Sequence, residues 1–456
     1  MATKFPMPKV RGALDQDTIA AIATPTGRGG VSVVRVSGPR AWAIAEAIAA
    51  RRIQPKTPVL CNFLSAAGEP IDQGLALLFK GPASFTGEDI AELHGHGGVV
   101  ITELLLKACL DNGARLARPG EFSERAFLND KMDLIQAEGL ADLIDAPTQQ
   151  AAKQAAASLR GEFSSAVQAV AAELINLRVF VEAAIDFPEE EVDFLSDGHI
   201  IEALSRCDQD LTDLISNARQ GALMRRGAKV VLTGQPNAGK SSVMNCLSKD
   251  AIAIVTDVPG TTRDVIRQHI DLEGVAIQLA DTAGLRDAED AIEQEGVNRA
   301  YAEMESADLI IEIIDDAADS HAPAATPSGI PVLRAFNKID LSGRPPGKVP
   351  EHPNTLAVSA ISGAGFDELI SSILADLGFA RDSPSTPFSA RERHIDALNR
   401  AHSLLLEASA SFGRSGAGEL LAEDLRKVHE ALGSITGKFN ADDLLGEIFS
   451  SFCIGK

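Results

Sequence analysis

The chain has 456 residues, with 64 acidic against 42 basic side chains, and its net charge at pH 7 is −22. Its length predicts about three domains of roughly 150 residues each. So acidic a chain is not expected to bind nucleic acid unaided, because phosphate contacts supply most of that affinity, and its 4% of aromatic residues argues against stacking platforms for single strands.

Membrane and export signals are missing from the sequence. No stretch approaches the ~20 uninterrupted apolar residues of a membrane span, and the opening residues MATKFP do not resemble a signal peptide. The cysteines lack CxxC and CxxH spacing, which fits a reducing compartment and gives no zinc motif. They are Cys61, Cys109, Cys207, Cys246 and Cys453. We therefore expect a cytoplasmic protein that does not associate with membranes.

Residues 1–131 combine strand-like and helical patterns. The runs 31–36 and 74–79 predict strands, and the apolar spacing over 100–110 predicts a helix. With many glycines, these patterns predict a compact α+β domain. The segment has 15 basic against 13 acidic residues, and its stretch 115–131 is a weak basic patch that could contact RNA.

From Leu134 onward the apolar residues recur at intervals of three and four. This spacing over 133–144, followed by alanine-rich sequence through Ala184 and again over 200–222, predicts amphipathic helices. Residues 132–224 carry 5 basic against 17 acidic side chains. We expect them to form the first part of a helical domain.

Residues 225–380 hold a set of short motifs and are expected to form a separate domain. The stretch 381–387, RDSPSTP, has the Pro and Ser content of a linker, and helical periodicity resumes at Ile395 within 381–456. Helices on both sides of a complete domain predict one discontinuous helical bundle with that domain inserted in it. Two independent helical domains remain the alternative. The predicted fold is thus multidomain, α/β plus α.

Four motifs follow one another in the middle segment. They are GQPNAGKS at 234–241, TTRD at 261–264, DTAG at 281–284 and NKID at 337–340. The first fits the phosphate loop G-x-x-x-x-G-K-[ST]. It lies between the apolar run 229–233, expected to be a buried strand, and 242–247, expected to begin a helix. In that context backbone N–H groups cradle phosphates.

The motif residues predict the nucleotide and its metal ion. Lys240 would reach the β and γ phosphates, and Ser241 would hold Mg²⁺. Asp340 favours GTP over ATP, because its carboxylate can accept from the ring N–H and the exocyclic amine of guanine, and adenine lacks that pair. The sequence therefore predicts a Ras-like P-loop GTPase domain.

Further positions complete the predicted nucleotide site. Thr262 is placed to coordinate Mg²⁺ and to sense the γ phosphate, Asp281 to hold Mg²⁺ through water, and Gly284 to contact the γ phosphate. The turn at Ser359 and Ala360 fits a guanine contact. The candidate GTP-binding residues are Asn237, Ala238, Gly239, Lys240, Ser241, Ser242, Thr256, Asp257, Val258, Pro259, Gly260, Thr261, Thr262, Asp281, Thr282, Ala283, Gly284, Asn337, Lys338, Asp340, Ser359 and Ala360.

Position 285 departs from the small regulatory GTPases. They have a glutamine after the DTAG motif that orients the attacking water, whereas this chain has Leu285, which can neither accept a proton nor orient a water. Another group must act. The candidates that follow are Asp287, Glu289, Asp290, Glu293 and Glu295, although most acids in such a run form a solvated face. Charge neutralisation could come from a partner's arginine or from a monovalent cation.

Stretches outside these motifs carry a family resemblance. They are DTIAAIATP at 17–25, GRGG at 27–30, SFTGED at 84–89, HGHGG at 94–98, ARPGEFSERAFLNDK at 117–131, EAAIDFP at 182–188 and FCIGK at 452–456. With them the chain resembles, essentially from end to end, the MnmE family (also called TrmE) of bacterial tRNA-modification GTPases.

The resemblance implies a function in tRNA modification. The family works with a flavin- and NADH-using partner, MnmG, in a heterotetramer. Together they add a carboxymethylaminomethyl or aminomethyl group to C5 of the wobble uridine in certain tRNAs. The carbon comes from 5-formyl- or methylene-tetrahydrofolate bound by the N-terminal domain, which also forms a homodimer.

The matching motifs also imply residues of a folate site. These would be Arg35, Glu92, Lys131 and the C-terminal Lys456. Such a set suits a folate, whose glutamate tail pairs with Arg and Lys and whose pterin N–H groups suit a carboxylate. The resemblance further implies a catalytic role for Cys453.

The resemblance offers an answer to the missing glutamine. The family is similar to GTPases that are activated when their own G domains dimerise around K⁺. Asn237 would hold K⁺ together with oxygens from Thr256, Val258 and Thr261. Glu293 matches the family's catalytic glutamate, which orients the water indirectly.

Two other function classes remain open from the residues. A ribosome-assembly or signalling GTPase would share the G domain and K⁺ dependence but would lack a folate site. A folate-dependent enzyme in which GTP is only regulatory would not need GTP hydrolysis for product formation.

Overall fold

The computed structural model of the chain describes residues 17–25, 27–186, 198–249, 252–253, 267–281, 301–318, 326–379 and 388–437, together with 445, 448–450, 452 and 455. The chain divides into two compact units, and each is described by itself. Unit 1 comprises Met1–Ala137 and Thr436–Lys456, and unit 2 comprises Glu138–Ile435. Among the described helices, none combines the length and apolar composition that crossing a bilayer requires.

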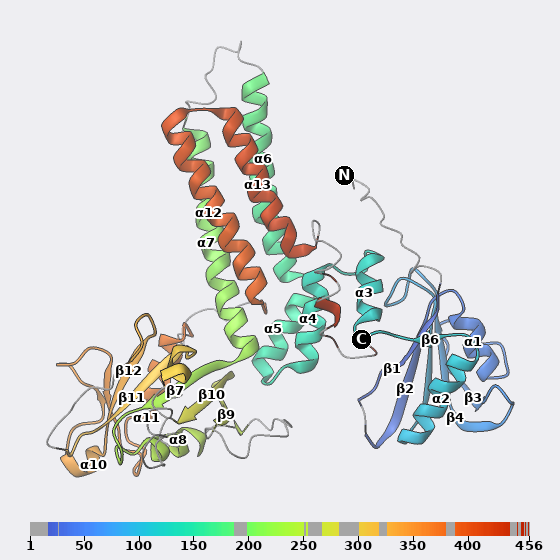
Figure 1. Cartoon of the computed structure of the whole chain (residues 1–456), viewed down its shortest axis with the longest axis horizontal. Helices are drawn as coiled ribbons and strands as arrows, with labels where there is room; N and C mark the ends of the chain where they lie inside the picture. Colours follow the sequence, from blue (N-terminus) through green and yellow to red (C-terminus); the bar gives the residue numbers. More distant parts are fainter. Residues whose placement is uncertain are drawn as a thin grey trace, which may run out of the picture. The chain divides into compact units, whose positions relative to one another are not determined.

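Unit 1 is built on a six-stranded sheet in the order β3-β4-β5-β2-β1-β6 (Figure 1). Its strands are β1 (Ile19–Ile22), β2 (Gly29–Ser37), β3 (Val59–Leu64), β4 (Pro70–Phe79), β5 (Ile90–Gly97) and β6 (Arg115–Leu116). Its helices are α1 (Ala41–Ile48), α2 (Val99–Asp111) and α3 (Glu121–Leu128). Neighbouring strands are antiparallel, except for the parallel pair β1 and β6.

The two faces of this sheet have different roles. On one face Val34, Phe63 and Leu93 pack with Ile44 of α1 and Leu105 of α2 in a fully buried core. Side chains alternate between faces along a strand, so the intervening residues face the opposite way. On this opposite face α3 covers β1, and the neighbouring strands β2 and β5 carry polar side chains. The predicted α+β fold of this part of the chain is confirmed.

The described end of the chain packs within unit 1. The side chains of Phe449 and Phe452 are buried, with ring centroids 5.4 Å apart, and Phe449 lies 6.2 Å from the ring of Phe127 in α3. A Cβ atom added to Gly455 would lie 2.2 Å from the carbonyl oxygen of Ile22, and φ of this glycine is +94°. The chain end therefore lies against α3 and β1.

Unit 2 contains a helical bundle formed by two separate parts of the chain. The helices are α4 (Leu134–Asp145), α5 (Gln149–Leu159), α6 (Glu162–Asp186), α7 (His199–Arg226), α12 (Glu392–Ser415) and α13 (Gly418–Thr436). Helix α7 lies beside both α6 and α12 (Figure 1). The predicted discontinuous bundle is thus confirmed, while the exact domain boundaries at 131, 224 and 380 stay predictions.

Buried polar groups join the two parts of this bundle. Glu138 of α4 accepts hydrogen bonds from Nε and Nη2 of Arg393 at 2.7 and 2.6 Å, and Nε2 of His394 lies 2.8 Å away. Burial favours the neutral acid, but the charges and hydrogen bonds of His394 and Arg393 hold the pKa of Glu138 well below its usual range. The ring of Phe163 stacks on Phe388 at 4.3 Å. An ionised carboxylate thus links residues 255 positions apart.

The segment between α7 and α12 forms an eight-stranded sheet in the order β13-β14-β12-β11-β7-β10-β9-β8. Its strands are β7 (Ala228–Thr233), β8 (Ile252–Ala253), β9 (Arg267–Leu272), β10 (Val275–Asp281), β11 (Leu309–Asp315), β12 (Val332–Asn337), β13 (Gly347–Lys348) and β14 (Thr355–Ala357). The helices that concern the site are α8 (Lys240–Lys249), α10 (Ile339–Ser342) and α11 (Phe366–Asp376). The five strands from β14 to β10 run parallel.

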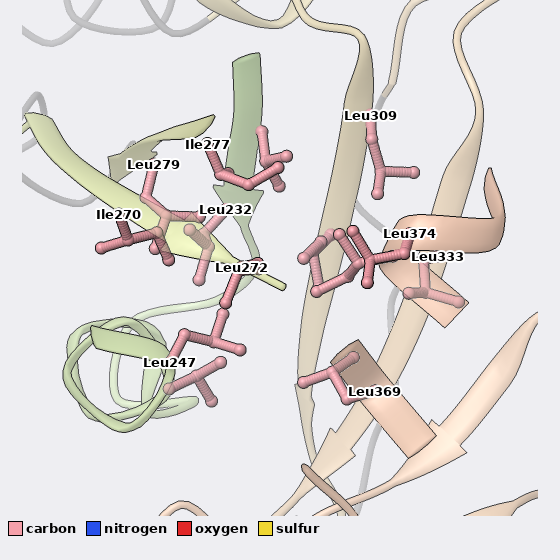
Figure 2. Packing of buried hydrophobic residues seen from close by; sticks show 14 of the residues in the cluster. Leu232, Leu247, Ile270, Leu272, Ile277, Leu279, Leu309, Leu333, Leu369 and Leu374 are labelled. Atoms are coloured by element: carbon pink, nitrogen blue, oxygen red, sulfur yellow. The ribbon is translucent and has the colours of Figure 1, made fainter. Parts of the chain in front are cut away.

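A single apolar cluster fixes helices α8 and α11 to this sheet. Figure 2 shows Leu272 of β9 between the strands and Leu247 of α8, with Leu369 and Leu374 of α11 packed near β11 and β12. All are buried. Because the central strands are parallel, their carboxyl ends share one edge of the sheet, where open α/β folds bind ligands. The motifs predicted to bind nucleotide follow those ends.

Candidate functional site

The phosphate loop occupies the turn between β7 and α8, as predicted. Gly234 has φ of +139°, and a Cβ atom there would lie 2.2 Å from the carbonyl oxygen of Ile313. Gly239 has φ of +92°, and its Cβ would lie 2.3 Å from Nδ2 of Asn337. Both positions therefore require glycine, since any side chain would push β11 or Asn337 away from the loop.

Lys240 begins α8 and lies over its own loop. Its side chain is nearly buried, and Nζ donates to the carbonyl oxygens of Gly234 and Gln235 at 3.0 and 2.9 Å. The ammonium group is thereby held beside the backbone N–H groups of the loop. That is the position from which a lysine neutralises the β and γ phosphates of a bound nucleotide.

Ser241 and Asp281 come together from different elements. Asp281 ends β10 and is 2% exposed, and the hydroxyl of Ser241 donates to its Oδ2 over 3.0 Å. A hydroxyl and a carboxylate side by side suit Mg²⁺, which prefers oxygen ligands and keeps several waters. No group of three or more His, Cys, Asp and Glu arranged for a metal occurs among the described residues.

Asn337 connects the two halves of the predicted nucleotide site. Its side chain is 2% exposed. Nδ2 donates to the carbonyl oxygen of Ala238 in the phosphate loop over 3.0 Å. Its Oδ1 accepts from the backbone N–H of Ala360 over 3.1 Å. One buried amide therefore fixes the phosphate loop and the predicted guanine turn relative to each other.

The carboxylate predicted to recognise guanine is oriented by a fully buried hydroxyl. Ser359 has no exposed surface, and its Oγ donates to Oδ1 of Asp340 over 2.5 Å. The same hydroxyl accepts from the backbone N–H of Ser362. Asp340 is exposed, so its carboxylate is accessible from solvent while Ser359 fixes its orientation.

Asp315 belongs to this site, although the sequence did not single it out. It ends β11, directly opposite Asn337 in the strand register, and its Oδ2 lies 2.6 Å from Nζ of Lys338. The hydrogen bond from Lys338 holds the pKa of Asp315 below its usual range. Lys338 itself has φ of +69°. Asp315 could have been found in the sequence as an acidic residue at the end of an apolar run. In the fold it lies at the same edge of the sheet as the other motifs.

Part of the predicted site lies outside the described residues. These positions are Thr256, Asp257, Val258, Pro259, Gly260, Thr261, Thr262, Thr282, Ala283, Gly284, Glu293, Cys453 and Lys456. The other predicted nucleotide residues of unit 2 gather at the carboxyl edge of its sheet. They are Asn237, Ala238, Gly239, Lys240, Ser241, Ser242, Asp281, Asn337, Lys338, Asp340, Ser359 and Ala360.

In unit 1, the predicted folate residues Arg35 and Glu92 form a pair on adjacent strands. They are direct partners in the register of β2 and β5, and Nε and Nη2 of Arg35 lie 3.0 and 2.9 Å from Oε1 of Glu92. The ring centroids of Phe85 and Phe122 lie 5.4 and 5.8 Å from the guanidinium carbon. A hydrogen bond with His94, and then the charge of Arg35, hold the pKa of Glu92 below its usual range.

Lys131 and the chain end are connected to the same region. Nζ of Lys131 donates to the carbonyl oxygen of Pro82 over 2.9 Å, and Phe85 of the same loop contacts Arg35. Gly455, the neighbour of Lys456, packs on Ile22, one register position from the partner of Arg35. The loop with Pro82 and Phe85 thus links Lys131 to Arg35, and Gly455 lies against β1, the strand next to β2.

Ion pairs occupy the arginines of the weak basic patch at 115–131, whose contact with RNA stays a prediction. Glu121 is 1% exposed and accepts from both Arg115 and Arg125 at 2.6 to 3.0 Å. Arg118 pairs with Glu124 at 2.8 Å. The arginines of this stretch therefore carry carboxylate partners, which leaves little positive charge free for phosphate groups.

Comparison with known proteins identifies relatives over nearly the whole chain. The family model described as the MnmE helical domain matches residues 134–453, and the model described as the GTP-binding protein TrmE N-terminus matches residues 18–131. The tRNA modification GTPase MnmE of Ectopseudomonas mendocina is 50% identical over 459 residues, which cover 97% of this chain and 99% of that protein. The protein of the same name from Nitrosomonas eutropha is 50% identical over 450 residues, covering 97% of this chain and 100% of that protein.

Similarity to solved structures is more limited. A variant of Aquifex aeolicus Era bound to GDP and aluminium fluoride is 25% identical, and the match covers 39% of this chain and 67% of that chain. Its TM-score is 0.27. So low a score supports no further argument.

Proposed function

The chain belongs to the MnmE family of tRNA modification GTPases, and from this premise we propose that it hydrolyses GTP in order to modify C5 of the wobble uridine in certain tRNAs. The observation that carries the GTPase part is the bridge from Ala238 through Asn337 to Ala360, because it sets the distance between a phosphate site and a base site. The tRNA part is supported by family membership, and the pairing of the candidate folate residues Arg35 and Glu92 in unit 1 is consistent with it.

In this proposal the residues of unit 2 bind and orient the nucleotide. Lys240 neutralises charge on the β and γ phosphates from its position over the loop. Asp340, with its carboxylate oriented by Ser359, accepts from the N–H groups of guanine. Lys338, held by Asp315, lies beside the base site with its ammonium already paired.

Cations would complete the reaction centre. Mg²⁺, when bound, withdraws negative charge from the phosphates, and Ser241 with Asp281 supplies oxygens of the type it takes. Asn237 is exposed on the phosphate loop, with φ of +62°. We propose that it holds K⁺ when the G domains of a homodimer meet. The oxygens of Thr256, Val258 and Thr261 would share that K⁺, Thr262 would share Mg²⁺, and Glu293 would orient the water.

Unit 1 would supply the carbon for the modification. We propose that Arg35, Glu92, Lys131 and Lys456 bind a 5-formyl- or methylene-tetrahydrofolate. The ionised Glu92 suits the pterin N–H groups, and the cations suit the glutamate tail. Phe85 and Phe122 bracket Arg35; Phe122 is fully buried, whereas the half-buried Phe85 has aromatic surface that a flat heterocycle can contact.

The reaction would be shared with a second protein. We propose that the flavoprotein MnmG joins the homodimer in a heterotetramer, acts on the tRNA and accepts the folate-derived carbon. A catalytic role for Cys453, three positions from the end of the sequence, belongs to the same proposal. So does a cytoplasmic location, where tRNA and folates are available.

Reconstitution tests the proposed function. The full-length chain, the flavoprotein, tRNA, GTP, K⁺ and methylene-tetrahydrofolate are combined with NADH and a nitrogen source, and wobble uridine is measured by mass spectrometry. Product formation should stop when folate is omitted or when GTP is replaced by a non-hydrolysable analogue. Product without folate would favour a GTPase of another class. Product with the analogue would mean that GTP is only regulatory.

Two variants test the proposed hydrolysis mechanism. Glu293→Ala should retain GTP binding and lose most hydrolysis, because only the orientation of the water is removed. Asn237→Ala should hydrolyse GTP slowly and at the same rate in KCl and NaCl. A loss of nucleotide affinity in the first variant, or an unchanged K⁺ response in the second, would remove that residue from its role.

A further inference from the structure

The two carboxylate oxygens of Glu92 are held by different residues. Oε1 receives both Nε and Nη2 of Arg35, at 3.0 and 2.9 Å. Oε2 lies 3.1 Å from Nε2 of His94, two residues further along β5. Each carboxylate oxygen accepts about two hydrogen bonds. Arg35 therefore fills Oε1, and the acceptor capacity that remains lies on Oε2, the oxygen that His94 contacts.

A second histidine on the same strand has a different environment. His96 lies two residues beyond His94, and its Nδ1 is 2.8 Å from Oδ1 of Asp72. The side chain of His96 is 74% exposed, whereas that of His94 is 27% exposed. Both histidines thus contact a carboxylate from one strand, but only His94 contacts the carboxylate that Arg35 holds.

We propose that His94 is a positioning residue of the folate site, which donates from Nε2 to Oε2 of Glu92 and so directs the free acceptor of that oxygen towards the N–H groups of a pterin. This inference rests on the proposed folate function. It names the group that orients the pterin-binding carboxylate, and His94 need not touch the ligand. A donor at Nε2 requires the neutral tautomer with hydrogen on Nε2, or the imidazolium.

Few other charged groups face this pair. Across β4, Leu77 lies opposite Glu92 and Leu75 opposite His94. From β2, Arg35 faces Glu92, and Val33 faces His94.

Two other described carboxylates of unit 1 have partners of their own. Glu88 accepts from Ser37 and Arg125, and Asp72 pairs with His96. The ionisation of Glu92 therefore depends chiefly on Arg35 and His94. The hydrogen bond with His94 contributes most to holding the pKa of Glu92 below its usual range.

The experiment measures 5-formyl-tetrahydrofolate binding to the full-length chain by calorimetry, from pH 7.5 down to about 4.5. The variants are His94→Leu, which removes the donor, and His94→Gln, whose amide N–H can occupy the position of Nε2. The matched control is His96→Leu, which removes the exposed histidine from the same strand. All variants are first compared in thermal unfolding and in GTP hydrolysis, which unit 2 performs.

His94→Leu should weaken binding by about tenfold, the usual effect of losing a hydrogen bond to a charged group. Its affinity should also begin to fall at a higher pH than that of the parent, because Glu92 without His94 takes up a proton more readily. His94→Gln should recover most of the affinity, and His96→Leu should stay within about twofold of the parent. If His94 only stabilised the fold, its replacement would not shift the pH at which folate affinity begins to fall.

Several results would overturn the inference. Unchanged affinity and pH profile in His94→Leu would show that His94 does not orient Glu92, while folate binding itself stands. An equal loss in His96→Leu would mean a general effect on the strand. No folate binding by the parent chain would overturn the proposed folate function together with this inference. If His94→Leu does not fold, the folate affinity of His94→Gln is compared with that of His94→Asn, whose amide side chain is shorter. Equal affinities of these two variants would show that His94 does not position Glu92.

Discussion

Nδ2 of Asn337 donates to the carbonyl oxygen of Ala238 over 3.0 Å, and this bond crosses 99 residues of sequence. It joins the end of β12 to the phosphate loop after β7, so the base and phosphate sites share one rigid connection. The amide is buried and also bonds the N–H of Ala360. Nucleotide affinity and the stability of unit 2 should therefore depend on the same side chain.

Replacing Asn337 by Ala should weaken both properties. The variant leaves the carbonyl oxygen of the buried Ala238 and the N–H of the half-buried Ala360 without this partner, which costs about 1–3 kcal/mol of unfolding free energy. GTP affinity should fall at least about tenfold. Fluorescent-nucleotide titration and thermal unfolding measure the two effects. Asn62→Ala is the control, because Asn62 makes one exposed bond to Gln73 in unit 1. Parent-like GTP binding by Asn337→Ala would contradict the bridge.

Replacing Asp340 by Asn should change the base that is recognised. Asparagine can donate to the C2 carbonyl of xanthine, whereas it cannot accept from both guanine N–H groups. GTP affinity should drop at least about a hundredfold, and xanthosine triphosphate should become the better substrate. Competition binding measures both nucleotides. The control is Asp367→Asn, in the first turn of α11, which should keep the preference for GTP. If Asp340→Asn also kept that preference, Asp340 would not be the residue that recognises guanine.

Replacing Gly455 by Ala should displace the end of the chain. The new Cβ would meet the carbonyl oxygen of Ile22 at 2.2 Å, in a backbone conformation with φ of +94°. That strain costs about 1–2 kcal/mol, and movement of the neighbouring Lys456 should reduce folate affinity while GTP hydrolysis stays normal. Gly413→Ala in α12 has no atom within 4 Å of its Cβ and should leave folate binding unchanged. Normal folate binding by Gly455→Ala would show that the end of the chain does not contribute to the folate site.

Glu121 predicts how unit 1 responds to acid. Burial alone would raise its pKa, but Arg115, the backbone of Arg118 and Arg125 lower the pKa of Glu121 from 4.5 to about 2. A depressed pKa gives stability that is present above pH 4.5 and is lost as the pH falls towards 2. The contribution is about 3 kcal/mol at neutral pH.

Thermal unfolding of Glu121→Gln at pH 7, 5 and 3 tests this account. The variant should be less stable than the parent at pH 7, and the difference should shrink at pH 3. Glu124→Gln on the same helix is the control. Burial raises the pKa of Glu124, so its removal should not produce the same loss at neutral pH. A constant difference between Glu121→Gln and the parent across the pH range would exclude the ion cluster as its cause.

The phosphate loop and the guanine motif could be predicted because each lies within a few consecutive residues. Contacts between distant residues could not be predicted in this way. No local sequence pattern predicts the bond from Asn337 to Ala238, which spans 99 residues, or the pairing of Glu138 with Arg393, which spans 255. Asp315 was missed because an acid after a strand has many possible roles. The ion pairs of the basic stretch 115–131 could not be predicted either, because counting charges along the sequence ignores the carboxylates that the fold places beside the arginines.

The central claim is that this chain takes part in modifying wobble uridines, and tRNA nucleosides from the source cells test it most directly. Mass spectrometry would compare cells with and without the gene, and cells that carry only Asp340→Asn. We predict loss of carboxymethylaminomethyl and aminomethyl uridines without the gene, and no recovery with the variant. Intact modified uridines in the cells that lack the gene would contradict the account and would favour a GTPase of ribosome assembly.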